Sequence, residues 1–292
     1  MRMRLKDRLD SGDFAILAEM DPPKGADASK MVATATRVKG AVDAFLIPEM
    51  SNAVMRMSSL GGALVLRQRG LETVVQANCR DRNRLALQAD LLSAYACGVN
   101  NIMAVTGDDP SVGDHHQAKP VYDIDLDQLL DVIRHLKQGR DMAGIELYGW
   151  PDFFVGSTVS PTVKEYHLDK EIQEMENKKN RGARFFITPP VFDLATLKPF
   201  LKRIDTSQVH IIPTVLLLKS AGMARYMDRN MDHISIPAEM IQRIQKAGDK
   251  TRECILIAKE LIAVLKKENF CGVCISTMGW EDKLPELLGT IG

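Results

Sequence analysis

The segment 102–110, IMAVTGDDP, places two carboxylates directly after a short apolar run. Gly107 ends the run, and Asp108 and Asp109 follow it. Glycine, aspartate and proline are also the commonest residues of surface turns. The segment therefore predicts either a plain turn or an acid held at the mouth of a site, and the surrounding elements must decide between the two.

A second acid, Glu19, ends the apolar run 14–19 and stands shortly before Pro22 and Pro23. Each proline fixes its own φ angle and restricts the residue before it, so the backbone after Glu19 is stiff. Burial at a site mouth would raise the pKa of this carboxyl group and suit it to general acid catalysis. A glutamate that only faces solvent at a strand end is an equally weighted interpretation.

Two further patterns raise the question of metal chemistry. Cys271 and Cys274 have the CxxC spacing, but no second CxxC occurs, and residues three apart on a strand point to opposite faces, which favours structural burial. His115 and His116 could be drawn around a metal with Asp108, although adjacent histidines in a loop of this composition are more often solvated. We therefore expect no metal site, and a metal-dependent lyase is a lesser alternative.

The composition sets outer limits on function. The chain has 292 residues, 45% of them hydrophobic, and its 38 basic and 38 acidic side chains balance, which gives no reason to expect a nucleic-acid or membrane partner. The segment 1–14 is charged, and no segment has the roughly 18 apolar residues of a membrane span. Five cysteines fit a reducing compartment, so we expect a cytoplasmic protein. The phosphate-binding patterns GxGxxG and GxxxxGK[ST] do not occur.

Short apolar runs alternate with helical patterns along the chain and predict eight strands. The runs are 14–19, 42–48, 73–78, 101–106, 153–159, 184–188, 209–215 and 271–277. The clearest helical stretches are 82–97, 168–181, 193–204 and 249–267, whereas segment 223–240 looks irregular. This alternation is typical of an α/β protein with a (β/α)₈ TIM barrel, here a single domain over residues 1–292. A doubly wound open sheet is the alternative, because periodicity alone cannot close a barrel.

The strand ends are more polar than packing alone requires. In a barrel of this kind the chemistry lies at the carboxyl ends of the strands. Besides Glu19, the polar residues at these ends are Gln76, Asn78, Thr106, Ser157, Thr158, Thr188, Ser276 and Thr277. The pattern predicts a cleft for a polar ligand and makes Asp108 part of its wall.

Several stretches, taken in order, resemble the methylenetetrahydrofolate reductases, flavin enzymes of one-carbon metabolism. They are AEMDPPKG (18–25), NCRDRNRLALQADLL (78–92), GVNNIMAVTGDDPSVGD (98–114), VYDID (121–125), DKEIQEMENKKNRGARFFIT (169–188) followed by PPVFD, and IIPTVLLL (211–218). Each motif alone is weak, but the ordered set extends over roughly 14–277. The runs RDRN and TGD are most similar to the branch that occurs fused to, or beside, corrinoid and homocysteine methyltransferase systems.

The resemblance implies a barrel that binds FAD, or FMN in some relatives. A hydride would pass from a donor through flavin N5 to the one-carbon unit of 5,10-methylenetetrahydrofolate, which gives 5-methyltetrahydrofolate. Glu19 matches the family's acid, which helps to protonate the folate nitrogen. Asp108 matches the aspartate near the flavin and the pterin, where its charge tunes the reduction potential. Asp108→Asn should therefore damage catalysis or folate binding, whereas Asp109→Asn should do little.

The resemblance also assigns binding residues and partners. Seven residues match flavin-contacting positions: Thr106, Gly107, Asp108, Tyr122, Asp123, Glu171 and Lys178. Of these, Glu171 and Lys178 would hold the ribityl or phosphate part, and their spacing of seven puts them on one helix face. Three residues would contact the substrate: Gln76, Asn78 and Thr188. The implied partners are methylenetetrahydrofolate and either NAD(P)H or an electron-donor subunit, in a homo-oligomer or a larger complex.

Pro189 is the clearest departure from the family pattern. The family often follows the threonine of this strand end with a glutamine that contacts folate, and a proline cannot supply that amide, so we expect Gln76 or Asn78 to replace it. Ser160 stands where some members have a histidine, and Thr106 where they have an arginine, which favours weaker flavin binding or FMN. The alternative function is a folate-binding or electron-transfer barrel subunit that works only within a larger methyltransferase or reductase complex.

Overall fold

The structure is a computed structural model that describes residues 3–161, 165–231 and 233–289. Its eight strands run parallel and form a closed barrel in chain order, with β1 paired to both β2 and β8. The strands are β1 (Ala15–Glu19), β2 (Ala44–Ile47), β3 (Thr73–Asn78), β4 (Asn101–Val105), β5 (Phe154–Thr158), β6 (Phe185–Pro190), β7 (His210–Leu216) and β8 (Gly272–Ser276). The predicted (β/α)₈ barrel is confirmed, and the alternative of an open sheet is wrong.

All eight predicted strands are present, and each ends within two residues of its predicted bounds. The reason is that a barrel strand is covered by helices outside and by packed side chains inside, so it reads as a continuous apolar run. β2, β4 and β8 are buried at every position. The length of each apolar run therefore marks the length of its strand.

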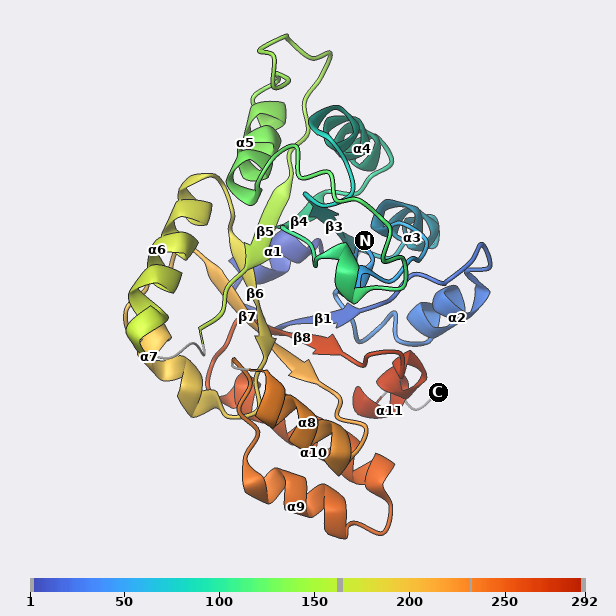
Figure 1. Cartoon of the computed structure of the whole chain (residues 1–292), viewed down its shortest axis with the longest axis vertical. Coiled ribbons are helices and arrows are strands. Elements are labelled where there is room, and N and C mark those ends of the chain that lie inside the picture. Colours follow the sequence, from blue (N-terminus) through green and yellow to red (C-terminus); the bar gives the residue numbers. More distant parts are fainter. Residues whose placement is uncertain (1–2, 162–164, 232, 290–292) are drawn as a thin grey trace.

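Helices surround the barrel (Figure 1). They are α1 (Leu5–Asp10), α2 (Ser29–Arg37), α3 (Ser59–Arg67), α4 (Arg84–Ala96), α5 (Leu126–Lys137), α6 (Glu165–Asn180), α7 (Lys198–Leu201), α8 (Ala221–Asn230), α9 (Ala238–Lys246), α10 (Lys250–Lys267) and α11 (Leu284–Leu287). The predicted helices 82–97, 168–181 and 249–267 are confirmed as α4, α6 and α10, and Asn83 and Asp249 cap the first and last of these. None of the helices in the described ranges is long and apolar enough to cross a bilayer.

Two predictions between β6 and β8 are wrong in detail. Segment 193–204 is not one helix but a 3₁₀ turn (Leu194–Leu197) followed by α7. Pro199 explains the break, because a residue without an N–H is tolerated only in the first turn of a helix. Segment 223–240 is not irregular, since α8 and α9 occupy most of it.

The barrel interior is packed from its N-terminal end. Leu5 and Leu9 of α1 are buried in the same apolar cluster as inward-facing strand residues, so α1 closes that end. Phe154 and Phe185 stack inside the barrel with ring centroids 5.0 Å apart. A second and larger cluster joins the outer strand faces to the helices. Because the N-terminal part of the interior is filled, the C-terminal ends of the strands are free to form a site inside the barrel mouth.

Candidate functional site

A cavity of about 620 Å³ opens at the C-terminal mouth of the barrel. Polar side chains from five strand ends line it: Glu19 of β1, Gln76 of β3, Thr158 of β5, Thr188 of β6 and Ser276 of β8. The structure thus brings together one predicted catalytic residue and two predicted substrate residues.

Another wall of the cavity is apolar and comes mainly from α8. Met223, Tyr226 and Met227 of this helix line the cavity, and so does Met231, which follows the helix. We call this surface the methionine wall. Methionine side chains are flexible and polarizable, so they adapt well to a flat ring. The sequence did not lead us to predict this wall, although methionines at every fourth residue are a weak signal for one face of a helix.

Glu19 is the one acidic side chain among the described residues that line the cavity. Burial raises the pKa of its carboxyl group to about 7, and the charge of Asp21 adds to the rise. A hydrogen bond with Ser276 acts in the opposite direction. With this pKa, a large share of the carboxyl group is protonated near neutral pH, so Glu19 can donate a proton to a bound ligand.

Gln76 is held by the neighbouring loop and helix. Its Oε1 accepts a hydrogen bond from the backbone N–H of Glu49 at 2.8 Å, and its own N–H donates to the Ser59 hydroxyl at 2.9 Å. The Nε2 amide has no hydrogen-bond partner within the described chain. Gln76 can therefore donate to a ligand in the cavity without giving up its anchor.

Asn78 does not line the cavity. It is fully buried, and its Nδ2 donates to the carboxylate of Asp81 at 2.9 Å. Arg80, which sequence analysis missed, is also buried, donates to both oxygens of Asp81 and donates to the carbonyl of Asp108 at 3.1 Å. The Arg80–Asp108 hydrogen bond thus ties the chain after β3 to the turn after β4, and the ion pair with Asp81 holds the buried guanidinium in place.

The end of β6 uses hydroxyl groups where the backbone lacks donors. Pro189 and Pro190 have no N–H, and the pairing of β6 with β7 shifts its register between Ile187 and Pro190. Thr214 bridges this gap: its hydroxyl donates to the Thr188 carbonyl at 2.6 Å, and its N–H donates to the Thr188 hydroxyl at 3.2 Å. Both prolines line the cavity, so this part of the lining offers no amide to a ligand.

The turn after β4 is locked by internal contacts. Gly107 has a φ of +90°, and a Cβ there would lie 3.0 Å from the Cβ of Arg80, so the site requires glycine. Asp108 accepts a hydrogen bond from the backbone N–H of Asn52 at 2.8 Å, and Asn52 lines the cavity. Asp109 caps the 3₁₀ turn Pro110–Val112, which is the turn position that the sequence predicts.

The residues assigned to flavin by resemblance are not among the described residues that line the cavity. They are Thr106, Gly107, Asp108, Tyr122, Asp123, Glu171 and Lys178. The Tyr122 hydroxyl donates to the Gly107 carbonyl at 3.4 Å. Asp123 accepts from the backbone N–H and the guanidinium of Arg84 at the start of α4. These two residues therefore already have partners within the protein.

Glu171 and Lys178 of α6 contact the end of β5 and the residues that follow it. Glu171 Oε1 accepts a hydrogen bond from the Ser160 N–H at 2.6 Å. Lys178 Nζ donates to the Thr158 carbonyl at 2.9 Å. The pair lies on one helix face, as its spacing predicts, and it fixes the segment that leaves β5.

A family model described as methylenetetrahydrofolate reductase matches residues 4–292. The protein belongs to the methylenetetrahydrofolate reductase family. It is 24% identical over 176 residues to methylenetetrahydrofolate reductase 2 of Schizosaccharomyces pombe, which covers 58% of this chain and 26% of that protein. It is 23% identical over 253 residues to a probable methylenetetrahydrofolate reductase (NADPH) of Caenorhabditis elegans, covering 80% of this chain and 34% of that protein. The chain thus spans about a quarter to a third of the length of these relatives.

A solved structure shares the fold of this methylenetetrahydrofolate reductase family member. EDTA monooxygenase from Chelativorans sp. BNC1 superposes with a TM-score of 0.56, covering 94% of this chain and 92% of that chain. The two sequences are 10% identical, so the likeness concerns the fold.

Lys219 adds a positive charge to the site of this family member. Among the described residues that line the cavity, it is the one cation. Its Nζ lies 5.4 Å from the ring centroid of Trp280 and donates to the carbonyl of Met278. Of the three N–H donors of this ammonium group, the carbonyl of Met278 accepts one. Lys219 was not predicted from the sequence, because nothing local shows that the end of β7 meets the end of β8.

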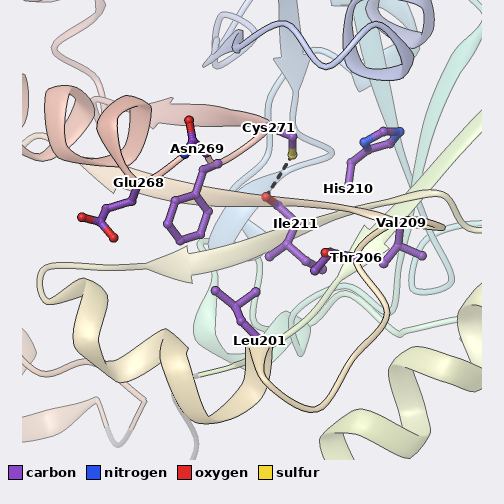
Figure 2. Close-up of a pocket in the computed structure, with 9 residues that line it drawn as sticks. Leu201, Thr206, Val209, His210, Ile211, Glu268, Asn269 and Cys271 are labelled. Atoms are coloured by element: carbon purple, nitrogen blue, oxygen red, sulfur yellow. Dashed lines mark hydrogen bonds between the residues drawn. The ribbon is translucent and has the colours of Figure 1, made fainter.

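The two cysteines of the CGVC segment lie in different places. Cys274 is buried inside the barrel and lines the mouth cavity, where burial raises the pKa of its thiol. Cys271 lines a separate groove of about 350 Å³ beside the start of β7, and its Sγ donates to the Ile211 carbonyl at 3.2 Å (Figure 2). Neither thiol is in a disulfide. The predicted structural burial is therefore confirmed for Cys274, whereas Cys271 is half-buried.

The histidines of the GDHH segment are engaged in local contacts. His115 Nδ1 lies 2.8 Å from the Asp114 carboxylate, and His116 Nδ1 lies 3.2 Å from the Ser111 carbonyl. In the described part of the chain, no group of three or more histidine, cysteine, aspartate or glutamate side chains could hold a metal ion.

Proposed function

We propose that this family member reduces 5,10-methylenetetrahydrofolate to 5-methyltetrahydrofolate with a bound flavin. The family match over nearly the whole chain supports the proposal. The observation that carries it is Glu19, whose carboxyl group lines the cavity with a pKa of about 7. Opening of the folate methylene bridge requires a proton, and a carboxyl group with this pKa can supply it at neutral pH.

Glu19 holds the proton on its carboxyl group until the folate nitrogen accepts it. Protonation makes that nitrogen a better leaving group, so the bridge opens to an iminium carbon that accepts a hydride. The hydrogen bond with Ser276 orients the carboxylate that remains. The charge of Asp21 and the burial of the site then favour uptake of a new proton by Glu19.

The rest of the cavity suits the chemistry of a folate. The methionine wall of α8 offers apolar surface for the pterin and aminobenzoyl rings. Gln76 and Thr188 supply polar groups for the pterin edge. The side-chain amide of Gln76 takes the place of the glutamine amide that the family often has where this chain has Pro189. Lys219 supplies a cation for a carboxylate of the glutamate tail.

A flavin, when bound, would supply the hydride. We propose FAD, with FMN as the alternative, on the side of the mouth formed by β4 and β5. Lys178 uses one of its three donors on the Thr158 carbonyl and keeps two for a phosphate. The exposed side chains of Thr106 and Thr158 add hydroxyl donors for ring carbonyl groups. This donor set fits a phosphorylated ring system.

A second function is favoured by the two prolines of β6. Pro189 and Pro190 line the cavity without offering an amide, which suits a barrel that binds folate or transfers electrons within a larger complex. Under the first proposal the electron donor is NAD(P)H or a donor subunit, and the protein forms a homo-oligomer. Activity of the purified chain with NADH alone would exclude the second function.

The absorbance spectrum of the purified protein tests the first proposal. We expect the absorbance bands of a bound flavin in the blue part of the visible spectrum, and release of FAD or FMN on denaturation. The bands should bleach when 5-methyltetrahydrofolate is added in the absence of oxygen. A colourless protein that gains no flavin on reconstitution contradicts the proposal.

A further inference from the structure

The loop that follows β2 concentrates strained backbone. Six non-glycine residues of the described chain have positive φ angles, and three of them stand within four positions: Met50 at 50°, Asn52 at 54° and Ala53 at 54°. Residues with a Cβ rarely adopt this region, and they persist there only where the surrounding fold holds them. The loop conformation therefore depends on contacts from other elements.

Two side chains from neighbouring strand ends hold the first half of the loop. Arg80 donates to the carbonyl of Met50 at 3.4 Å, and Asp108 accepts from the backbone N–H of Asn52 at 2.8 Å. Arg80 also donates to the carbonyl of Asp108. The buried arginine and the exposed aspartate thus form one connected support for the left-handed residues.

The segment 113–114 holds the second half. A Cβ at Gly113 would lie 1.9 Å from the carbonyl oxygen of Ala53, so only glycine lets the two backbones approach. Asp114 accepts from the N–H of Met55 at 2.9 Å and pairs with Lys24. Four separate contacts therefore maintain a conformation that the loop sequence itself disfavours.

This support presents Asn52 to the cavity. The side chain of Asn52 is exposed and lines the cavity, and its carboxamide has no hydrogen-bond partner within the described ranges. A carboxamide offers a donor and an acceptor side by side. The complementary group on a ligand is a lactam edge, an N–H next to a carbonyl, which both the pterin of a folate and the ring of a flavin carry.

We propose that Asn52 is a specificity-determining residue whose carboxamide hydrogen-bonds the lactam edge of the ring bound in the cavity. Asp108 is the positioning residue that holds Asn52 there through its backbone N–H. The inference rests on the proposed function for the identity of the ring. It gives Asp108 a role that is independent of its charge, because any acceptor at that position can hold the loop.

Binding titrations of an Asn52→Gly variant test the specificity role. Glycine adopts the same φ angle without strain, so the variant keeps the fold and loses only the carboxamide. The matched control is Asn269→Gly, the same change at a φ of 59° in the groove at the other end of the barrel (Figure 2). We expect roughly tenfold weaker binding of either 5-methyltetrahydrofolate or FMN, as for loss of a paired hydrogen bond, and the control to stay within about twofold. The probe whose binding weakens carries the ring that Asn52 contacts.

Variants of Asp108 separate positioning from charge. Asp108→Asn keeps an oxygen that can accept from Asn52, so ring affinity should stay within about twofold, and the damage expected from the lost charge of Asp108 should then appear in the rate of catalysis. Asp108→Ala removes the acceptor, so it should weaken binding of the same ring whose binding Asn52→Gly weakens. The double variant should bind no more weakly than Asn52→Gly alone, because Asp108 acts through Asn52.

The outcomes distinguish this inference from the proposed function. A wild-type protein that binds neither probe contradicts the proposed function and the inference with it. A wild-type protein that binds both, together with an Asn52→Gly variant that binds both within twofold of wild type, overturns the inference alone. Additive losses in the double variant would overturn the positioning role of Asp108.

Discussion

The two ends of the barrel differ in what fills them. The N-terminal end is apolar and relaxed, with Leu5 and Leu9 of α1 packed against the interior cluster. The C-terminal mouth is polar and strained: of the six non-glycine residues with positive φ in the described chain, only Asn269 lies away from it. Apolar packing at the N-terminal end stabilises the fold, and this stability allows strained backbone to persist around the site at the other end.

The contrast also concerns partners for polar groups. On the β2 to β4 side of the mouth, Arg80 and Asp108 make internal hydrogen bonds that support the backbone. Glu19, Gln76 and Lys219 instead line the open cavity. Rigid support thus lies next to groups that remain available to a ligand, which is the arrangement that preorganised binding requires.

The largest expected effect comes from removing the support of the mouth. Arg80→Ala leaves Asp81 without its buried partner and frees the loop after β2, so we expect a loss of about 4 kcal/mol in the free energy of unfolding. Urea denaturation measures it, with Arg134→Ala of the exposed Arg134–Asp131 pair as a control that should lose less than about 1 kcal/mol. Ring affinity should also fall in Arg80→Ala. A loss of unfolding free energy no larger than that of the control would contradict the claim that Arg80 supports the mouth.

Damage at the other end should affect stability alone. Leu9→Ala opens a cavity in the N-terminal part of the interior, where Leu9 is 2% exposed, and should cost about 3 kcal/mol. Below the unfolding transition, its affinity for 5-methyltetrahydrofolate should match that of the wild type. A parallel loss of affinity would show that the two ends are not independent.

A smaller effect is expected when Lys219, the cation that lines the cavity, loses its charge. Lys219→Met keeps the length of the side chain and removes its charge, so binding of 5-methyltetrahydrofolate should weaken about tenfold, since a charge-assisted hydrogen bond is lost. A tetrahydropterin without the aminobenzoylglutamate tail is the control ligand and should bind both proteins equally. Equal weakening of both ligands would place Lys219 at the ring instead of the tail.

The sequence predicts the barrel well because each strand is an uninterrupted apolar run, and the rule that chemistry lies at strand ends selects Glu19, Gln76 and Thr188. It does not predict the methionine wall, because the spacing of Met223, Met227 and Met231 is a weak signal by itself in a segment that otherwise looks irregular. Arg80 and Asn52 depend on partners about 30 or more residues away, as in the hydrogen bonds Arg80–Met50 and Asn52–Asp108. The left-handed loop gives no local sign either, since it contains no glycine.

The pH dependence of the folate half-reaction, measured by rapid mixing in wild type and Glu19→Gln, tests the role of Glu19 most directly. The acid form of Glu19 is present below its pKa of about 7 and is lost above it, so the wild-type rate should fall as the pH rises through 7. Glu19→Gln should be slower by at least about 100-fold and lack this limb, while flavin reduction by the donor stays within about twofold. Survival of both half-reactions in the variant would contradict the assignment of Glu19 as the acid.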